Sequence, residues 1–500
     1  MSHTTLADLV ADPYAKKSYL AIINPYKISS TTITPFYYSD SGFVTTPTDT
    51  PANIYFDARL IEPLGFSRSM FSSNKLGGES TASFGSIVLT NNDGGLDTLA
   101  TDYAFDGREI EIKVGEAGAS YSHHFTIFKG SMRSLEFDDA LLTIQMRDKQ
   151  DIFEKDLQTT LYAGSGGTEG TSNIKNTPKP LLFGECKNVR PVLVDPTNFI
   201  YQVHTGAIQD IVTVYDGALV LSSGVTKDLT NGRFTLSTEP TNEVTCDVQG
   251  AKNGSGTYLY KAADIIDYII QTYGGISSSD IDSASISALN TANANKIGIY
   301  IDYITPINEV LDLIADTVGA FYGFDRESDF EIARVDLPSG TAALELDSTN
   351  ILEIERLSSA LPNYRIRVGY SRNFTAMNES DLSATATTAQ RDFVTRDMLY
   401  EKDDTAATLV SYPLSKEMVV ESLFLEVAAA TAEATRLLSI YDTQRDVYRV
   451  KLKTQPYSIK LNSVVNITFS RYNLTAGKLF RCVGMSEDAT VNEVTLDLWG

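Results

Sequence analysis

Short segments in which apolar and polar residues alternate run through most of this chain and set its fold class. Each segment is bounded by Gly, Asn, Asp or Pro, which favour turns. LLTIQM at residues 141–146 and VTLDL at residues 494–498 are examples, and each has one apolar and one polar face. The 26 Tyr and 22 Phe fit this pattern because aromatic side chains pack well on a pleated sheet. The sequence therefore predicts a mainly β protein in which helices are the minority.

Helical spacing of apolar residues is confined to three regions. One is residues 262–273, which Gly274 and Gly275 end. The second has Thr305 as its expected N-cap and Pro306 at its first helical position, and it runs to Gly319. A hairpin over residues 320–335 should follow it and turn through residues 326–328. The third region is an Ala-rich segment at residues 426–441. The first two helices and the hairpin predict a compact α+β module.

Two segments far apart in the chain share an order of features. Residues 125–146 and 479–498 each contain a strand with an apolar face, a glycine, a polar turn and a closing alternating strand. Matching Gly130 with Gly484 places Thr143 and Thr495 13 and 11 residues later. We interpret this as an internal duplication, so the chain should carry two similar β-barrel domains separated by other structure.

Charge and cysteine content exclude several classes of protein. The formal net charge of −23 opposes tight binding to nucleic acid, which depends on Lys and Arg displacing counterions from phosphate. The N-terminus lacks the pattern of a signal peptide and no stretch is long and apolar enough to cross a membrane, so we expect synthesis and assembly in the cytoplasm. The three cysteines lie too far apart in sequence for a disulfide framework or a thiolate metal site, and they are expected to be buried: Cys186, Cys246 and Cys482.

None of the four histidines sits in a metal-binding or catalytic motif. His3 stands alone, and His123 and His124 precede a strand, where neighbouring side chains point to opposite faces, so we expect a surface turn there. A nucleophile pair of Cys186 and His204 has no support in sequence spacing.

Glycine-rich and acidic stretches also lack a complete motif. The stretch at residues 250–256 has no Gly-Lys-Ser or Gly-Lys-Thr ending and is interpreted as a flexible linker, and no G-x-S-x-G elbow is present. The acidic pairs at residues 138–139 and 403–404 are expected in solvated turns. Acids alternate over residues 325–331 as in a calcium loop, but Phe330 stands where an EF-hand needs glycine, so a hairpin turn is preferred. We therefore expect no catalytic, cofactor-binding or metal residue, no cofactor and no enzymatic activity.

Several motifs of the chain resemble those of phage tail structural proteins, over roughly residues 80–500. They are FGSIVL (84–89), LYAG (161–164), PKPLLFG (178–184), YQVH (201–204), NGRF (231–234), RIRVGY (365–370), GKLFR (477–481) and LDLWG (496–500). These motifs are similar to those of baseplate or tail hub proteins. Such hubs carry two tube-like barrel domains per chain, so that a homotrimer presents six barrels to a hexameric tail tube.

The resemblance implies an arrangement in which two tube-like β-barrel domains flank a β-rich module and an α+β module. We expect an N-terminal arm (1–50), a first barrel domain (51–160), a β-rich inserted module (161–260), an α+β module (261–350) and a second barrel domain with one helix (351–500). The implied function is a structural hub of the virion's tail tip. It would connect the tail tube to fibre or spike proteins and form part of the DNA ejection channel.

The implied partners are other copies of the chain, a tail tube or distal tail protein, fibre or spike proteins and a tape measure protein. Two alternatives stay open at this point. One is a distal tail ring or a tail tip protein that binds host glycans. The other is a tail-associated peptidoglycan hydrolase, for which the sequence offers no intact motif.

Overall fold

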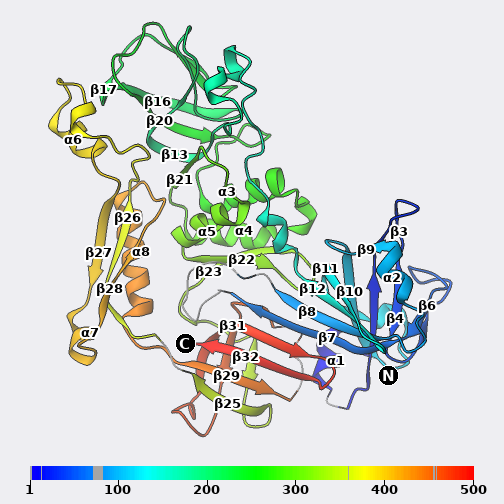
Figure 1. Ribbon diagram of the computed structural model, residues 1–500. Coiled ribbons are helices and arrows are strands. Elements are labelled where there is room, and N and C mark those ends of the chain that lie inside the picture. The colour runs from blue at the N-terminus through cyan, green and yellow to red at the C-terminus, as the bar shows by residue number, and fades with distance from the viewer. Residues whose placement is uncertain are drawn as a thin grey trace.

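The computed structural model describes residues 3–12, 14–70, 81, 83–357, 360–453, 457 and 459–500 (Figure 1). Strands predominate over helices, and they are distributed over several sheets with separate hydrophobic cores. The expected mainly β, multidomain architecture is confirmed. No helix in this part of the chain has the length and apolarity needed to span a membrane.

The largest sheet that the described residues form has 15 strands and contains two sets of five that are connected alike. In chain order, the strands of the first set, called the first unit, are β7 (Leu60–Ser69), β8 (Phe84–Thr90), β10 (Glu109–Glu116), β11 (Phe125–Phe137) and β12 (Leu141–Arg147). Those of the second unit are β25 (Ile351–Leu357), β29 (Val447–Leu452), β30 (Val464–Ile467), β31 (Lys478–Asp488) and β32 (Glu493–Trp499).

The order of strands in space is the same in both units. In the first unit it is β7-β8-β12-β11-β10, and in the second it is β25-β29-β32-β31-β30, with every neighbouring pair antiparallel. Each unit thus begins with two adjacent strands, and its last strand returns to pair with the second. The unit ends in a hairpin, β11-β12 or β31-β32, and these hairpins are the two segments that the sequence predicts to be duplicated.

The first unit rolls up around its own core but its ladder stays open. Strand β1 (Lys17–Ile23), from the expected N-terminal arm, pairs with β10, and β4 (Phe36–Ser39) pairs with β1. Four strands separate β1 from β7 in the sheet, yet the two come within 8 Å, and both contribute to the same core. Inward-facing residues of the second unit form a separate core.

Two closed barrels were expected, and among the described residues no sheet closes on itself. The ladders stay open because a strand of each unit pairs with a strand of the other unit. β31 of the second unit pairs with β7 of the first, so the units share one continuous sheet and neither uses that edge to close its own ladder.

The segments between and within the units form further modules. Between them, β13 (Leu181–Val189), β16 (Ile208–Asp216), β17 (Leu219–Val220), β20 (Val244–Ala251) and β21 (Gly298–Ile301) form one sheet, and β14 (Val192–Asp195), β15 (Ile200–Gln202), β18 (Val225–Asp228) and β19 (Arg233–Leu236) form another. Side chains of both sheets share one core, as in a sandwich.

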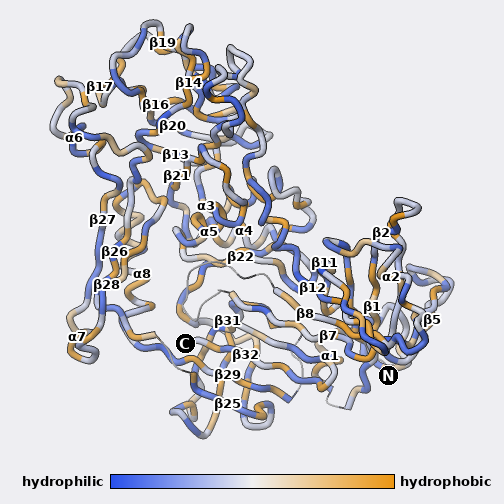
Figure 2. The backbone as a smooth tube through the Cα atoms, viewed as in Figure 1, coloured by the Kyte–Doolittle hydropathy of each residue, from blue (hydrophilic) through white to orange (hydrophobic). Residues whose placement is uncertain are grey.

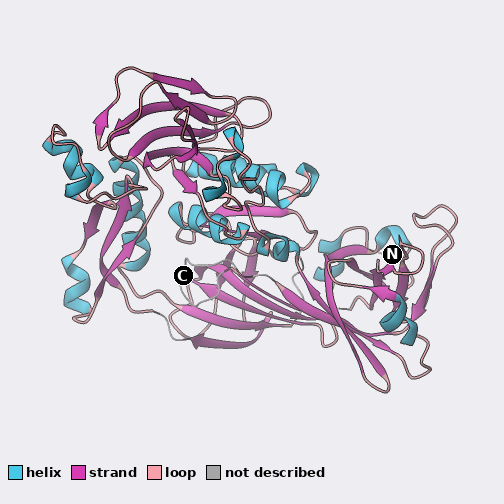
Figure 3. Ribbon diagram, turned by 45° about the horizontal axis from the view of Figure 1, so that its top comes forward, coloured by secondary structure: helices cyan, strands magenta, loops and turns pink. Residues whose placement is uncertain are grey.

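A helical layer lies between this β module and the long sheet (Figures 1 and 3). It contains α3 (Ala262–Ile269), α4 (Ser283–Ala292), α5 (Ile307–Thr317) and the hairpin β22 (Ala320–Phe324) to β23 (Phe330–Arg334). A second insertion, between β25 and β29, contains β26 (Asn363–Tyr370), α6 (Thr388–Val394), β27 (Leu399–Asp404), α7 (Ala406–Ser411), β28 (Lys416–Val420) and α8 (Val427–Tyr441). The two layers share a single core. In Figure 2 apolar segments are spread through every module, as expected for several cores.

Local signals placed these helices well, with one correction. The helix expected at residues 262–273 corresponds to α3 and the π-helical turn Ile270–Gly274 that continues it, and Gly275 caps this turn with φ +77°. The helix expected at residues 426–441 corresponds to α8. The N-cap of α5 is Pro306 and makes no side-chain capping bond, whereas the Thr305 hydroxyl donates to Glu309 Oε2. The predicted cap was therefore wrong by one residue.

Candidate assembly site

The closing hairpins of the two units carry a β-bulge at the same place. Arg133 of β11 and Val483 of β31 each lie outside the ladder that the strand makes with its hairpin partner. A bulge adds one residue to a single strand and bends it, so it marks a fixed point for comparing two sheets. Ser134 of the first unit therefore corresponds to Gly484 of the second.

The first two strands of each unit carry a second matched bulge. Ile61 of β7 lies outside the ladder with β8, and Leu352 of β25 lies outside the ladder with β29. Both are exposed apolar residues, at 49% and 51% of their surface, and each is followed by an exposed acid, Glu62 or Glu353. The two units thus share the chemistry of the bulge as well as its position.

The two bulges give one alignment of the units. Counting along the closing hairpins from their bulges makes Leu142 equivalent to Val494. Counting from the other bulge makes Leu89 equivalent to Leu452, and these residues pair with Leu142 and Val494 respectively. Independent routes reach the same pair, so the units correspond residue by residue along β8 and β29 and along β12 and β32. Strand β7 has one further irregularity, between Glu62 and Gly65, that β25 lacks.

This alignment confirms one part of the sequence match and corrects another. Thr143 does correspond to Thr495, as predicted. Gly130 does not correspond to Gly484, whose counterpart is Ser134. The space around the two glycines also differs. A Cβ on Gly130 would lie 2.6 Å from the Arg147 carbonyl oxygen, whereas one on Gly484 would come no closer than 3.3 Å to the Asp497 side chain and 3.6 Å to the Arg68 carbonyl oxygen. The glycine match was a coincidence of composition.

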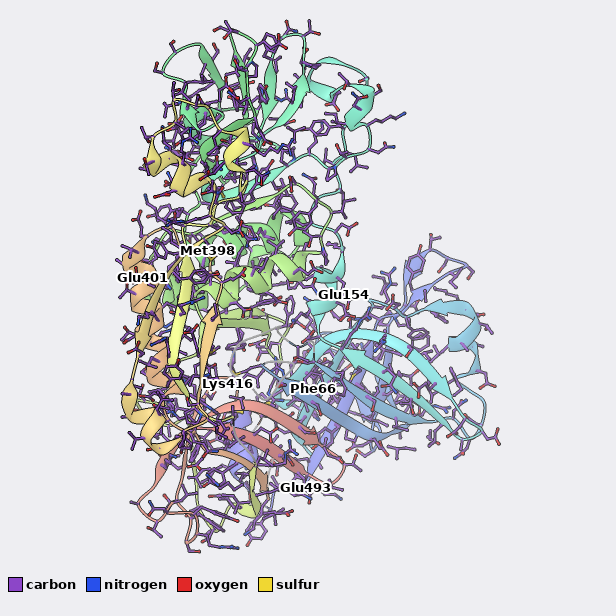
Figure 4. The ribbon with its side chains drawn as sticks, turned by 60° about the vertical axis from the view of Figure 1, so that its left-hand side comes forward. Phe66, Glu154, Met398, Glu401, Lys416 and Glu493 are labelled. Atoms are coloured by element: carbon purple, nitrogen blue, oxygen red, sulfur yellow. The ribbon has the colours of Figure 1, made fainter. Side chains whose placement is uncertain are left out.

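The units are joined where the closing hairpin of the second meets the first strand of the first. In this joint, residues 484–488 of β31 pair antiparallel with residues 65–69 of β7, and Glu487 stands opposite Phe66. Figure 4 labels Phe66 beside the red strands of the second unit. Backbone pairing continues past the strand end, where the Met70 amide donates to the Val483 carbonyl oxygen at 2.9 Å.

A buried turn from the helical layer is inserted at this joint. It is the turn between β22 and β23, expected from sequence only as a hairpin turn. The Arg326 guanidinium donates to both carboxylate oxygens of Glu487, and the two side chains keep only 8% and 1% of their surface exposed. On the other side, the Lys129 amide donates to the Arg326 carbonyl oxygen, and the Ser328 hydroxyl donates to the Lys129 carbonyl oxygen. One turn therefore contacts both units.

Burial acts on every charged side chain around the turn, and partners within the protein oppose part of its effect. Burial lowers the pKa of Arg68, and the neighbouring Arg326 lowers it further, while its guanidinium donates to the Phe324 carbonyl oxygen. Burial opposes the charge on Arg326 as well, yet the Glu487 carboxylate holds its pKa above the usual value. Burial raises the pKa of Asp148, which accepts from two backbone amides. Local sequence patterns do not indicate this cluster, because its members come from four distant segments of the chain.

Two strand edges that correspond to the joint stay open. On β11, residues 134–137 pair with β12 on one side, and β10 ends opposite Ser131 on the other. On β25, the side away from β29 pairs with no strand of the described chain. Phe137 is 37% exposed, whereas Glu487, its counterpart in the joint, is 2% exposed.

The histidines and cysteines are not gathered at one place. His124 is buried rather than on a surface turn, because its Nε2 lies 3.0 Å from the Ser18 hydroxyl and its ring packs against Phe43. His204 is buried too, which lowers its pKa to about 4, and its Nδ1 accepts from the Leu182 amide. The three cysteines are free and buried, as predicted: Cys186, Cys246 and Cys482. No group of possible metal ligands occurs in the described residues.

The remaining candidate stretches are structural. Asp138 accepts from two amides in the exposed turn between β11 and β12, as predicted. Asp403 and Asp404 do not lie in a turn. They end strand β27, and the Asp404 carboxylate accepts a hydrogen bond from the Arg365 guanidinium. Residues 252–258 form a short bridged turn held by the Asn253 side chain, so this stretch is not a flexible linker.

The solved structures that the fold matches include tail proteins. One is a 43 kDa tail protein of prophage MuSo2 from Shewanella oneidensis, with 10% identity over 89% of this chain and 94% of the other, and a TM-score of 0.40. Another is prophage tail protein gp18 from Listeria monocytogenes, with 9% identity over 96% of this chain and 94% of the other, and a TM-score of 0.43. A third is a tail protein from Neisseria meningitidis, with 9% identity over 96% of both chains and a TM-score of 0.38.

These descriptions name the class of protein that the sequence motifs resemble. No family model matches the chain, and no curated protein matches it. With identities of 9–10% and TM-scores of 0.38–0.43, these likenesses concern the fold alone.

Proposed function

We propose that this chain is a non-enzymatic structural hub of a phage tail tip. It connects the tail tube to the fibre or spike proteins and lines part of the channel through which DNA leaves. It is a component of the virion that is assembled in the host cytoplasm.

The matched units carry this proposal. They share strand order and two bulges in one register, and they are joined edge to edge in a single sheet. A chain with two equivalent units in succession suits a partner with twice as many subunits as the hub has chains. Three copies supply six units, which match a hexameric tube, and the motifs of the sequence resemble proteins that work in this way.

The rolled shape of the first unit agrees with a tube-like barrel domain. Its ladder brings β1 and β7 within 8 Å of each other around one core, so little separates it from closure. We propose that both units are the tube-like barrels and that they are completed in the assembled ring, where a neighbouring chain covers the open edges.

The inserted modules are proposed to hold the fibre or spike proteins. They project together from one side of the long sheet (Figure 1). The acidity of the chain, with a formal net charge of −23, suits a channel wall that repels the DNA backbone. A strongly basic wall in the assembled ring would contradict this part of the proposal.

Native mass spectrometry of the purified chain tests the proposal. We expect a species at three times the chain mass of 54.7 kDa, and ring-shaped particles of that species by electron microscopy. A species at six times the mass would favour the distal ring instead. A strict monomer at every concentration, with or without tail tube protein, would overturn the hub. Zymography on peptidoglycan addresses the hydrolase alternative, and a clear zone would refute a non-enzymatic role.

A further inference from the structure

The joint inside the chain uses one edge from each unit and leaves the two corresponding edges unused. The second unit contributes the end of β31, and the first contributes β7. Their counterparts are the end of β11 in the first unit and β25 in the second. Both counterparts are open in the described structure, so each chain carries one edge of each kind.

The alignment of the units predicts how these open edges would pair. Glu487 corresponds to Phe137 by counting from the bulges of the closing hairpins. Phe66 corresponds to Arg356 through their ladder partners, because Phe66 pairs with Gly85 and Arg356 pairs with Tyr448, and these partners are equivalent in β8 and β29. In the joint, Glu487 stands opposite Phe66. The same register places Phe137 opposite Arg356, and Glu136 opposite Leu357.

Exposure of the open edges agrees with a missing partner. Ser134 and Phe137 are exposed, while Gly484 and Glu487 at the same positions of the joint are buried. An edge strand with unpaired amides and carbonyls and an exposed aromatic ring is an unfavourable surface to leave in water. At the equivalent positions of the joint, Gly484 and Glu487 are covered because β31 pairs with β7.

We propose that residues 136–137 of β11 in one copy pair antiparallel with residues 356–357 of β25 in the next copy, and so repeat between chains the joint that exists within each chain. This inference rests on the proposed hub. The occupant is a second copy, because the strand needed beside the end of β11 has the position, direction and register that β7 has beside the end of β31, and β25 is the equivalent of β7. Such a contact is heterologous, and a heterologous contact that closes forms a ring. In a trimer, three joints within chains alternate with three between chains.

The register makes the proposal testable by disulfide formation. Residues directly opposite in an antiparallel ladder have Cα atoms about 4.5–5.5 Å apart, within the range that a disulfide spans. The variant F137C/R356C should therefore form disulfides between copies when it is oxidised. We expect a covalent trimer on non-reducing gels that reverts to the single chain on reduction. The natural thiols are buried and should not compete.

A matched control uses a cysteine three positions along the same strand. In F137C/E353C the two Cα atoms would be offset by about 10 Å along the strands, at a rise of about 3.3 Å per residue, which is too far for a disulfide. This control should give at least tenfold less cross-linked product than F137C/R356C. The circular dichroism of both variants should match that of the wild type, because Phe137 and Arg356 lie on the surface of the single chain.

The outcomes separate this inference from the proposed function. A native trimer whose F137C/R356C variant fails to cross-link, or cross-links no better than F137C/E353C, would overturn the inference and leave the hub intact. A chain that stays monomeric in all conditions would overturn both. A second variant pair, E136C/L357C, tests the same register without removing the ion pair between Arg356 and Asp446.

Discussion

Replacing Glu487 with Gln should destabilise the protein more than any other single change of one atom at the joint. The variant keeps the shape of the side chain but removes the charge that balances Arg326, which is itself buried. Leaving one member of a buried pair uncompensated costs about 3–5 kcal/mol. The upper part of that range is expected here, because the Glu487 carboxylate also offsets part of the cost of burying the Arg68 charge.

The expected loss of unfolding free energy can be measured as a shift of the thermal unfolding transition. At roughly 2–4 °C per kcal/mol for a domain of this size, the transition of the two units should fall by on the order of 10 °C. Differential scanning calorimetry measures it, and hydrogen exchange should show faster exchange at the amides of the turn that carries Arg326.

The double variant R326M/E487L is the control for this prediction. Apolar side chains of similar volume often replace a buried ion pair at little net cost, so it should lie within about 1 kcal/mol of the wild type. A loss below about 1 kcal/mol in E487Q, or a double variant as unstable as E487Q, would refute the view that charge balance holds the turn at the joint.

Three further predictions concern buried groups elsewhere in the chain. Burial lowers the pKa of His204 to about 4, against 6.5 when unfolded, so its contribution to stability is complete above pH 6.5 and is lost as the pH falls towards 4. Urea unfolding at pH 7 and at pH 4.5 should therefore show a fall in the free energy of unfolding that the H204N variant lacks. Gly184 has φ +70° and a Cβ there would lie 1.9 Å from the Ile297 carbonyl oxygen, so G184A should cost about 2–4 kcal/mol, whereas G254A in open space should be neutral. Burial raises the pKa of the Cys482 thiol to about 12 and leaves all three thiols covered, so Ellman's reagent should react with none in the folded chain and with three in guanidinium; a fast-reacting thiol would contradict the packing of Cys186, Cys246 and Cys482.

Local pattern predicted the hairpins of both units and the principal helices, because alternation and helical spacing are properties of neighbouring residues. It also detected the duplication through Thr143 and Thr495. The register needed the bulges, and a bulge at Arg133 or Ile61 leaves no mark in composition. For that reason a shared glycine at 130 and 484 was matched in error.

Long-range pairing was beyond the reach of the sequence. The joint brings Phe66 opposite Glu487 across most of the chain, and no local signal encodes such a contact. The same holds for Arg326, whose neighbourhood of alternating acids predicts a hairpin but gives no reason to expect burial. The assembly site is therefore visible only when the strands are placed.

The buried turn between β22 and β23 has a mechanical consequence. The turn pairs with Glu487 of one unit through Arg326, and it makes two hydrogen bonds to the Lys129 backbone of the other unit, one with the Arg326 carbonyl oxygen and one with the Ser328 hydroxyl. Tilting the inserted modules against the sheet would therefore require breaking a buried ion pair and these two hydrogen bonds. A force applied to the inserted modules would thus be transmitted to both units of the sheet at once, instead of being absorbed by a hinge.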